Sequence, residues 1–247
     1  MAIALVNTTS GTDQTGTNLA SISATASSHT TSNLVVVFVK HGTNRTTTIN
    51  VTDTALNSYI PIGPLFPGTV TGGGAAQMFY ARNITGNASN VVKATFSSLV
   101  AFPTILVLQY SGLDTVAPLD AFDGRAQDTT SFVSNAFTTK FANEVVVCCV
   151  TTNNGGVTFT RGLIGGVNST IEVHISDSAA EDLIVSSVQT GITAAMSANT
   201  GTSGIILTAT FRSPISGSVD AGVVVNESLQ GGAANVGVVN IITVNGS

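Results

Sequence analysis

Two nearly continuous apolar stretches decide the fold class: Leu34-Val35-Val36-Val37-Phe38-Val39 and Val145-Val146-Val147-Cys148-Cys149-Val150. Both are rich in β-branched side chains, and both are far shorter than the ~20 apolar residues that a membrane-spanning helix needs. A short run that is apolar on both of its alternating faces is typical of a central strand covered on both sides. The sequence therefore predicts two buried central strands, one in each half of the chain.

Shorter apolar runs of strand length surround these two stretches, separated by Gly, Asn, Ser and Thr. Several alternate with a period of two; Ile171, Val173 and Ile175 fall on one face and Glu172 and His174 on the other. The clearest runs are 47–51, 77–81, 90–96, 104–110, 157–160, 170–175, 182–188, 204–211, 219–225 and 236–244. A helical pattern is confined to a short turn at 192–197. We therefore predict an all-β fold, an antiparallel β-sandwich.

The two apolar stretches begin in a similar way, with Asn33-Leu34-Val35-Val36-Val37 echoed by Asn143-Glu144-Val145-Val146-Val147. We expect two pseudo-repeated halves, 33–111 and 143–212, that share one core in a jelly-roll-like sandwich. The residues between them, 112–142, are expected to form a long crossover.

The predicted sandwich then forms one domain over residues 33–212, which suits the size range of all-β domains. Residues 1–32 are expected to form an N-terminal strand or arm. Residues 213–247 are expected to form a C-terminal extension used in assembly, because an uncharged strand at a free edge invites pairing with another chain.

The composition excludes several classes of protein. Only 9% of residues are charged, Lys and Arg total 8, and the formal net charge is -5. Dispersed basic residues cannot form the positive stripe that nucleic-acid binding needs, so no nucleic-acid partner is expected. No apolar run approaches membrane-spanning length, so no membrane partner is expected either.

The chain start and the cysteines indicate a compartment. Residues 1–7 lack the basic start and the apolar stretch of a secretory signal, so we expect a chain that is not exported by that route or one that has been trimmed. Cys148 and Cys149 are adjacent in a predicted strand and point to opposite faces, so they do not bond each other. We expect folding in a reducing compartment.

No catalytic constellation stands out, and we expect a protein that is not an enzyme. His29, His41 and His174 are each expected at the surface, with no recognisable Ser-His-Asp spacing and no local zinc cluster. The run Gly72-Gly73-Gly74 lacks the Lys and Ser/Thr of a phosphate loop and predicts a wide turn.

One acidic cluster allows two interpretations. Asp114, Asp120, Asp123 and Asp128 lie in the predicted crossover, and a flexible loop with several carboxylates could hold a structural calcium ion. In the alternative, the loop is solvated and Arg125 pairs with Asp123 or Asp128. No other cofactor is expected.

Carbohydrate binding has a thin basis in the sequence. Sandwich modules that bind sugars present flat aromatic rings, and this chain has no Trp and only Tyr59, Tyr80 and Tyr110. Tyr80 and Tyr110 lie within apolar strand patterns and are expected in core or interface packing, which leaves Tyr59.

Residues 19–212 contain several short sequence stretches that resemble those of a known group of domains. They include residues 34–39, Val51-Thr52-Asp53-Thr54-Ala55, Asn57-Ser58-Tyr59, Tyr80-Ala81-Arg82-Asn83-Ile84 and Leu108-Gln109-Tyr110-Ser111-Gly112-Leu113-Asp114. Together they resemble Ser/Thr-rich β-sandwich domains of bacterial surface or extracellular proteins and of tailed-phage structural proteins. The resemblance implies a structural or adhesive module and no catalytic residues.

These expectations favour a non-enzymatic virion structural protein, a phage head-decoration, head-fibre or tail-associated subunit that is assembled in the host cytoplasm. Its partners would be copies of itself and other virion shell or tail proteins. The alternative is a bacterial surface or secreted adhesion module that binds glycans.

Assembly is expected through apolar edges near both ends of the chain. The residues assigned to these edges are Ile3, Leu5, Val236, Val238, Val239, Ile241, Ile242 and Val244.

Overall fold

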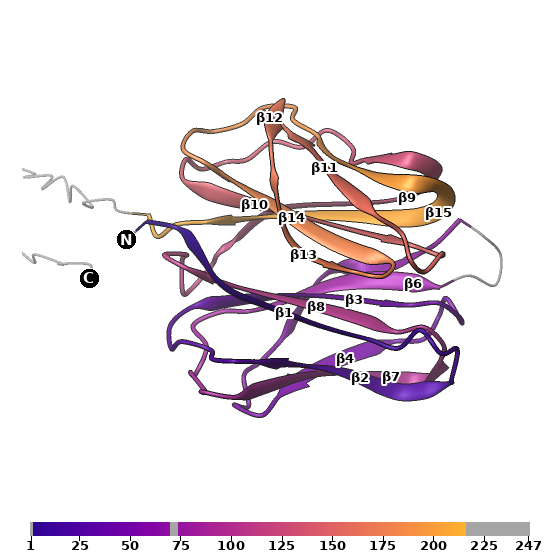
Figure 1. Ribbon diagram of the computed structural model, residues 1–247. Coiled ribbons are helices and arrows are strands. Elements are labelled where there is room, and N and C mark those ends of the chain that lie inside the picture. The colour runs from indigo at the N-terminus through magenta and orange to yellow at the C-terminus, as the bar shows by residue number, and fades with distance from the viewer. Residues whose placement is uncertain (1, 70–73, 216–247) are drawn as a thin grey trace, which may run out of the picture. The chain divides into compact units, whose positions relative to one another are not determined.

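The computed structural model describes residues 2–69 and 74–215, and these residues form antiparallel strands and turns without a helix (Figure 1). The strands of the first half are β1 (Ala4–Thr12), β2 (Leu19–Ala26), β3 (Leu34–His41), β4 (Ile49–Asp53), β5 (Ile60–Pro67), β6 (Ala75–Ala81), β7 (Asn90–Val100) and β8 (Thr104–Ser111). Those of the second half are β9 (Leu119–Val133), β10 (Glu144–Thr152), β11 (Phe159–Ile164), β12 (Val167–Asn168), β13 (Thr170–Ile175), β14 (Ser178–Val185) and β15 (Ala194–Arg212). The predicted all-β, antiparallel sandwich is confirmed.

The first half is a sandwich of two sheets. A five-stranded sheet has the order β1-β8-β3-β6-β5, and a three-stranded sheet has the order β2-β7-β4. Val35, Val37 and Val39 of β3 pack between them against Val51 and Val92 of the smaller sheet. Alternate residues of β3 face this core because successive side chains of a strand point to opposite faces.

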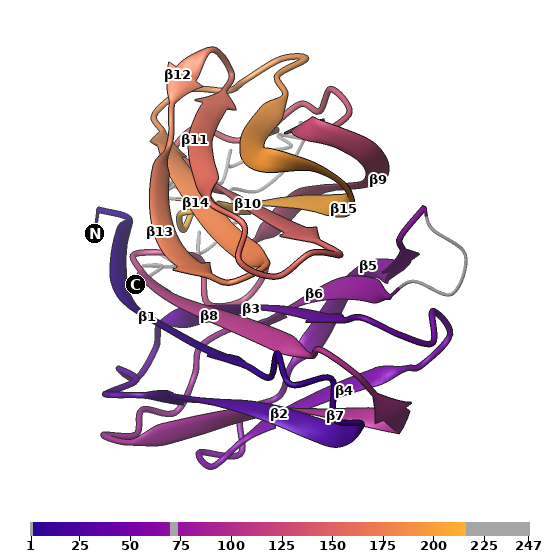
Figure 2. The same ribbon diagram turned by 45° about the vertical axis from the view of Figure 1, so that its right-hand side comes forward.

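The second half repeats this connectivity with two long strands that pass through both layers (Figure 2). Residues 204–212 of β15 pair with β10, and residues 194–198 pair with β11. β9 pairs with β15 on both sides of a register irregularity. The order β9-β15-β10-β14-β13 thus corresponds to β1-β8-β3-β6-β5, and β9-β15-β11 corresponds to β2-β7-β4.

A central core lies between the two halves, which Figure 1 shows with β1–β8 below and β9–β15 above. Leu34, Val36 and Phe38 of β3 belong to this core together with Val145 and Val147 of β10. The opposite faces of β3 and β10 fill the separate cores of their own halves. Each half therefore has its own core, and the single shared core that we expected is the third one, between them.

The segment expected to be an N-terminal strand or arm and the segment expected to be a crossover both contain strands of the sheets. Residues 1–32 contain β1 and β2, which pair with β8 and β7, and residues 112–142 contain the 15-residue strand β9. These strands carry Ser, Thr, Asn and Asp and are mostly half-buried, so they lack the apolar runs that marked the others. A strand rich in Ser and Thr lacks an apolar pattern, so it is identified from the neighbouring strand with which its backbone forms hydrogen bonds.

Of the smaller predictions, one was wrong and one is confirmed. The short helical turn at 192–197 was wrong, because β15 begins at Ala194. Cys148 and Cys149 are free and buried on opposite faces of β10, as predicted. Among the described residues, no helix has the length and apolar character to cross a membrane. The runs at 219–225 and 236–244 lie outside the described residues.

Candidate functional site

A cavity of about 800 Å³ opens where the two halves meet at one end of the central layers. The first half supplies the ends of β3 and β6 and the turn between β7 and β8, and the second half supplies β10, β15 and the turns after β10 and β13. The register places Thr104, Thr152 and Gly204 at this end, opposite Ser111 and Arg212. The last residues of β15, at Arg212, therefore lie at the end of the strands away from the cavity.

An ion pair between Lys40 and Asp177 lines the cavity and joins the two halves. Lys40 is near the end of β3, and Asp177 lies in the two-residue turn between β13 and β14. The side chains are 5% and 2% exposed. Because a buried charge without a partner is costly, each of these ions holds the other in place.

Asp177 is the centre of a polar network that crosses the junction. Its carboxylate accepts hydrogen bonds from Gln14 Nε2 at 3.1 Å and Thr104 Oγ1 at 3.1 Å, both in the first half, and from Ser178 Oγ at 2.9 Å. Its backbone carbonyl accepts a hydrogen bond from Thr152 N at 2.8 Å. The turn that carries Asp177 is therefore fixed against both halves.

The Lys40 ammonium has hydrogen-bonding capacity to spare. An ammonium group offers three donors, and within the described residues its acceptor is Asp177. Burial lowers the pKa of Lys40, and the negative charge of Asp177 opposes that effect. Lys40 therefore lines the cavity with donor capacity beyond the one bond to Asp177, and the adjacent carboxylate balances its charge.

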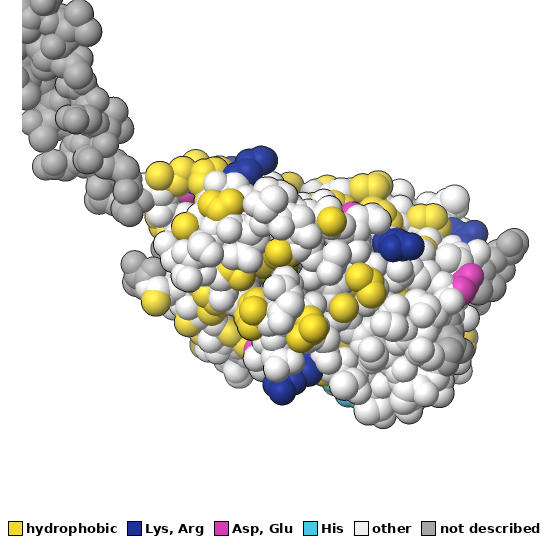
Figure 3. Space-filling view, turned by 90° about the horizontal axis from the view of Figure 1, so that it is seen from above, with side chains coloured by type: hydrophobic (Ala, Val, Ile, Leu, Met, Phe, Trp, Pro, Cys, Tyr) yellow, Lys and Arg dark blue, Asp and Glu magenta, His cyan; other side chains and the backbone are white. Residues whose placement is uncertain are grey.

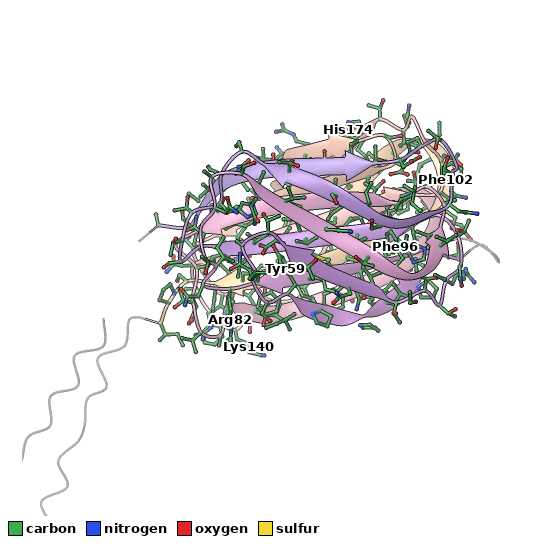
Figure 4. All side chains as sticks on the ribbon, turned by 90° about the horizontal axis from the view of Figure 1, so that it is seen from below. Tyr59, Arg82, Phe96, Phe102, Lys140 and His174 are labelled. Atoms are coloured by element: carbon green, nitrogen blue, oxygen red, sulfur yellow. The ribbon has the colours of Figure 1, made fainter. Side chains whose placement is uncertain are left out.

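Phe102 forms an aromatic rim on the first-half side. It lies in the turn between β7 and β8, is 38% exposed, and has a φ of +52°, a conformation that residues other than glycine rarely adopt. A Cβ placed on Gly16 or Gly42 would lie 3.1 or 3.0 Å from its ring, so these glycines make room for it. Figure 4 shows Phe102 at the opposite end of the strands from Arg82 and Lys140.

Another part of the cavity lining is an amide-rich turn after β10. Asn153 and Asn154 are exposed there, and Asn153 N donates to Ser203 O at 3.0 Å. Gly156 N donates to Ser176 Oγ at 3.2 Å, which ties this turn to the one that carries Asp177. The cavity thus combines one aromatic ring, several amides and hydroxyls, and one balanced ion pair.

The four aspartates proposed for calcium do not converge. Asp114 pairs with Arg212 at 2.9 Å, and Asp120 pairs with Lys140 at 3.5 Å. Asp123 accepts a hydrogen bond from Asn135 N at 2.8 Å, and Asp128 accepts one from Thr69 Oγ1. The described residues contain no group of three or more metal-binding side chains. Asp114 lies before β9, and the three aspartates within that strand contact different neighbours, so the structure does not bring the four carboxylates together.

Tyr59 is occupied inside the first half. Its hydroxyl donates to Asp53 Oδ2 at 3.0 Å, and the same oxygen accepts a hydrogen bond from Asn90 Nδ2 at 2.8 Å. The Asn90 amide nitrogen also lies 2.7 Å from His29 Nδ1. Tyr59 is half-buried in this network with its hydroxyl engaged, and it lines a second, smaller cavity of about 400 Å³. Tyr80 is buried in the central core, as predicted.

Two of the three histidines are not at the surface. His29 and His41 are buried, and His41 Nδ1 lies 2.7 Å from Thr43 O. Burial lowers the pKa of both rings, which favours the neutral form. His174 is exposed, as predicted.

Sequence reasoning missed two carboxyl pairs in the second half. Glu144 is fully buried beside Asp120, and burial followed by that neighbouring carboxylate raises the pKa of Glu144 to about 7. Glu172 is the unpaired residue of a bulge between β13 and β14, and burial and Asp182 raise its pKa to about 7. Only the strand register brings these carboxyls together.

Asp182 extends the second pair across the junction. Its carboxylate accepts a hydrogen bond from the hydroxyl of Tyr110 on β8 at 2.8 Å. Tyr110 is fully buried, as predicted for core or interface packing, and burial raises its pKa further. The junction therefore has an apolar centre, with Lys40 and Asp177 on one side and Tyr110 and Asp182 on the other.

The predicted N-terminal assembly residues lie inside their own fold. Ile3 is buried in the central core, and Leu5 is half-buried against it. β1 pairs with β8 through its backbone, and Val6 on the same strand is exposed. This corrects the expectation that Ile3 and Leu5 meet another chain. The other residues assigned to assembly, from Val236 to Val244, lie outside the described residues.

Comparisons with known proteins leave the family open. No family model matches the chain, and no curated protein matches it. A solved structure of an anti-sigma factor domain-containing protein from Clostridium clariflavum is similar over 75% of this chain and 77% of that one, with 11% identity and a TM-score of 0.22. A likeness at that score carries no argument about this chain's fold or function.

Proposed function

We propose that this chain is a non-enzymatic virion structural protein that acts through self-assembly. The observation that supports this proposal most is the union of two complete sandwiches through an apolar core, with each central strand covered on both faces. Such packing resists deformation, because protein interiors are close-packed and a change in side-chain volume of even one methylene group disturbs them. A stiff block suits a repeated structural subunit.

The distribution of charge supports the same proposal. Within the described part of the chain, five acidic residues are buried, namely Asp53, Glu144, Asp177, Glu181 and Asp182, and the side chain of Asp120 is 1% exposed. The face in Figure 3 accordingly presents mostly uncharged polar atoms with scattered apolar side chains and few charges. Surfaces with few charges repel one another weakly and favour association.

The partners proposed are copies of this chain and other virion shell or tail proteins, and the proposed location is the virion, assembled in the host cytoplasm. The contact is assigned to the C-terminal extension, whose uncharged run at 236–244 suits strand addition to a neighbour. The phage context comes from the resemblance of residues 19–212 to structural β-sandwich domains.

Removal of residues 216–247 tests the assembly proposal. Residues 1–214 form one compact unit, so the shortened chain should keep its β-sheet circular dichroism. We expect the full chain to form oligomers by light scattering after gel filtration, and the shortened chain to be a monomer. Ile241→Asp in the full chain should weaken assembly at constant length. A full chain that is monomeric at every concentration, or a shortened chain that assembles equally well, contradicts the proposal.

A second candidate function is a glycan-binding adhesion module at a cell surface or outside the cell. The cavity rimmed by Phe102 favours it, because that ring is exposed next to amides and hydroxyls.

A further inference from the structure

We propose that the cavity between the two halves binds an uncharged saccharide, with its ring against Phe102 and its hydroxyls on the amides and on the Lys40–Asp177 pair. This inference gives the second candidate function a site and does not depend on the assembly proposal. It places binding at the end of the central layers away from the point where the described chain leaves β15.

The size of the cavity fits a small ligand. Its volume of about 800 Å³ is within the ~300–1,000 Å³ range of small-molecule sites. It lies at a junction between two folded halves, which is a preferred place for such sites. One or two sugar rings would fit this space.

The backbone around the cavity is strained in a way that presents the aromatic ring. Phe102 at φ +52° and Ser176 at φ +43° both line the cavity, and both occupy a left-handed backbone conformation that is strained for residues other than glycine. The turn at Phe102 is held by Gly42 N, which donates to Ala101 O at 2.7 Å, and by Asp13 N, which donates to Pro103 O at 3.0 Å. The surrounding hydrogen bonds thus hold Phe102 in a strained backbone conformation that leaves its ring partly exposed.

The chemistry of the lining matches a sugar. A pyranose has an apolar face of C–H groups that can stack on an aromatic ring, and hydroxyls that both donate and accept hydrogen bonds. Asn153 and Asn154 offer amide donors and acceptors in the lining of the same cavity as Phe102, and the Lys40 ammonium has donors beyond the one that Asp177 uses. Each group that a sugar needs is therefore present in one cavity.

The charge balance of the lining selects an uncharged ligand. The charges of Lys40 and Asp177 cancel, and burial lowers the pKa of His41, so that ring is neutral near pH 7. An acidic sugar would bring a carboxylate next to that of Asp177 without a second cation to offset it. We therefore expect uncharged saccharides to bind and acidic ones to bind more weakly.

Saturation-transfer NMR with the full chain tests the inference. The probes are a panel of uncharged oligosaccharides of glucose, galactose, mannose and N-acetylglucosamine, with sialyllactose and glucuronic acid as charged probes. We expect saturation of ring C–H protons in at least one uncharged sugar and weaker saturation of the acidic ones. Absence of saturation throughout the panel, or saturation of the acidic sugars alone, overturns the proposal.

A matched pair of variants locates the binding. Phe102→Gly removes the ring at a positive φ that glycine accepts, so the turn is preserved. Leu56→Gly is the control, because Leu56 also has a positive φ (+60°) and is 91% exposed away from the cavity. We expect Phe102→Gly to weaken binding about tenfold and Leu56→Gly to leave it unchanged. Equal binding by both variants overturns the proposal.

The rim amides give a second test that does not touch the core. Asn153→Ala and Asn154→Ala change exposed side chains, and we expect either change to weaken binding several-fold. The oligomeric state of the Phe102→Gly variant should stay that of the unchanged chain. Loss of saccharide binding and loss of assembly are therefore measured separately, and either proposal can fail while the other stands.

Discussion

The two halves share one strand order but break their strands differently. In the first half, β1 and β2 are separated by residues 13–18, and β7 and β8 by residues 101–103, whereas β9 and β15 of the second half run through both layers. Pro103 has no amide hydrogen, and Phe102 has a positive φ, so neither suits an uninterrupted strand. The comparison teaches that the break in the first half is also the feature that exposes an aromatic ring at the cavity.

The halves also differ in how they bury acidic groups. In the first half, burial alone would raise the pKa of Asp53, but hydrogen bonds from Asn90, Asn57 and Tyr59 outweigh it and hold that pKa below its usual value. In the second half, Glu144 and Glu172 face other carboxyls, and their pKa values rise to about 7. The same fold thus stabilises a carboxylate in one half and a protonated carboxyl in the other.

The largest predicted effect concerns the coupling of the halves. Phe38 lies in the central core, and Phe132 lies in the core of the second half alone. We expect Phe38→Ala and Phe132→Ala each to lower the free energy of unfolding by about 3–5 kcal/mol, because both rings are fully buried. Urea unfolding followed by circular dichroism measures this.

The shape of those unfolding curves sharpens the comparison. The central core couples the halves, so we expect one transition in both variants. Two separate transitions in Phe132→Ala, with the first half unfolding later, would mean that the halves fold independently.

The next effect is a dependence of stability on pH that has opposite signs in the two halves. Glu144 and Glu172 keep a proton in the folded state between their usual pKa of 4.5 and about 7, so the folded state binds more protons there than the unfolded state. The contribution of these two carboxyls to the free energy of unfolding therefore falls as pH rises through that window, by at most ~1.4 kcal/mol per pH unit for each retained proton. The lowered pKa values of His29 and His41 in the first half contribute in the opposite direction, because near and below their usual pKa of 6.5 the unfolded state binds more protons than the folded state. Asp53 acts in the same direction as these histidines, because its lowered pKa gives stability that is lost as pH falls below 3.8.

Urea titrations between pH 4 and 8 measure the part of this dependence that comes from Glu144 and Glu172, and titrations below pH 4 measure the part that comes from Asp53. Glu172→Gln keeps the hydrogen-bonding shape without the titration, so we expect a shallower decline of stability with pH. Asp123→Asn, on a carboxylate that is bonded to Asn135, is the control and should leave the slope as it is. A Glu172→Gln variant with an unchanged slope contradicts the prediction.

The smallest effect concerns positive φ in the turns of the first half. Leu56→Gly removes an exposed side chain from a left-handed conformation, and we expect a gain of about 0.5 kcal/mol in the free energy of unfolding. Phe102→Gly relieves the same kind of strain but also loses the ring contacts with Gly16 and Gly42, so its gain should be smaller. Thermal unfolding of both variants gives the difference, and a larger gain for Phe102→Gly would show that its ring contributes no packing.

Part of the candidate site could be read from the sequence in principle. Lys40 follows an apolar run directly, and Phe102 stands before a proline between two strands; both are local anomalies. Asp177 gave no such signal, because its partners Gln14 and Thr104 lie 163 and 73 residues away. The aspartates of β9 are close in sequence, which suggested a cluster of carboxylates, but in the strand each of them contacts a different neighbour.

The sequence by itself determined the fold class and the central strands, because runs such as 34–39 and 145–150 are apolar on both faces and fit only a covered position in a sheet. It also determined the opposite directions of Cys148 and Cys149, which follow from the period of a strand. Only the tertiary structure decided that polar β1, β2 and β9 are strands, that Ile3 is buried, and that Lys40 meets Asp177 beside Phe102. The physical reason is that a strand without an apolar run, and an ion pair between distant residues, are stabilised by partners that sequence proximity does not identify.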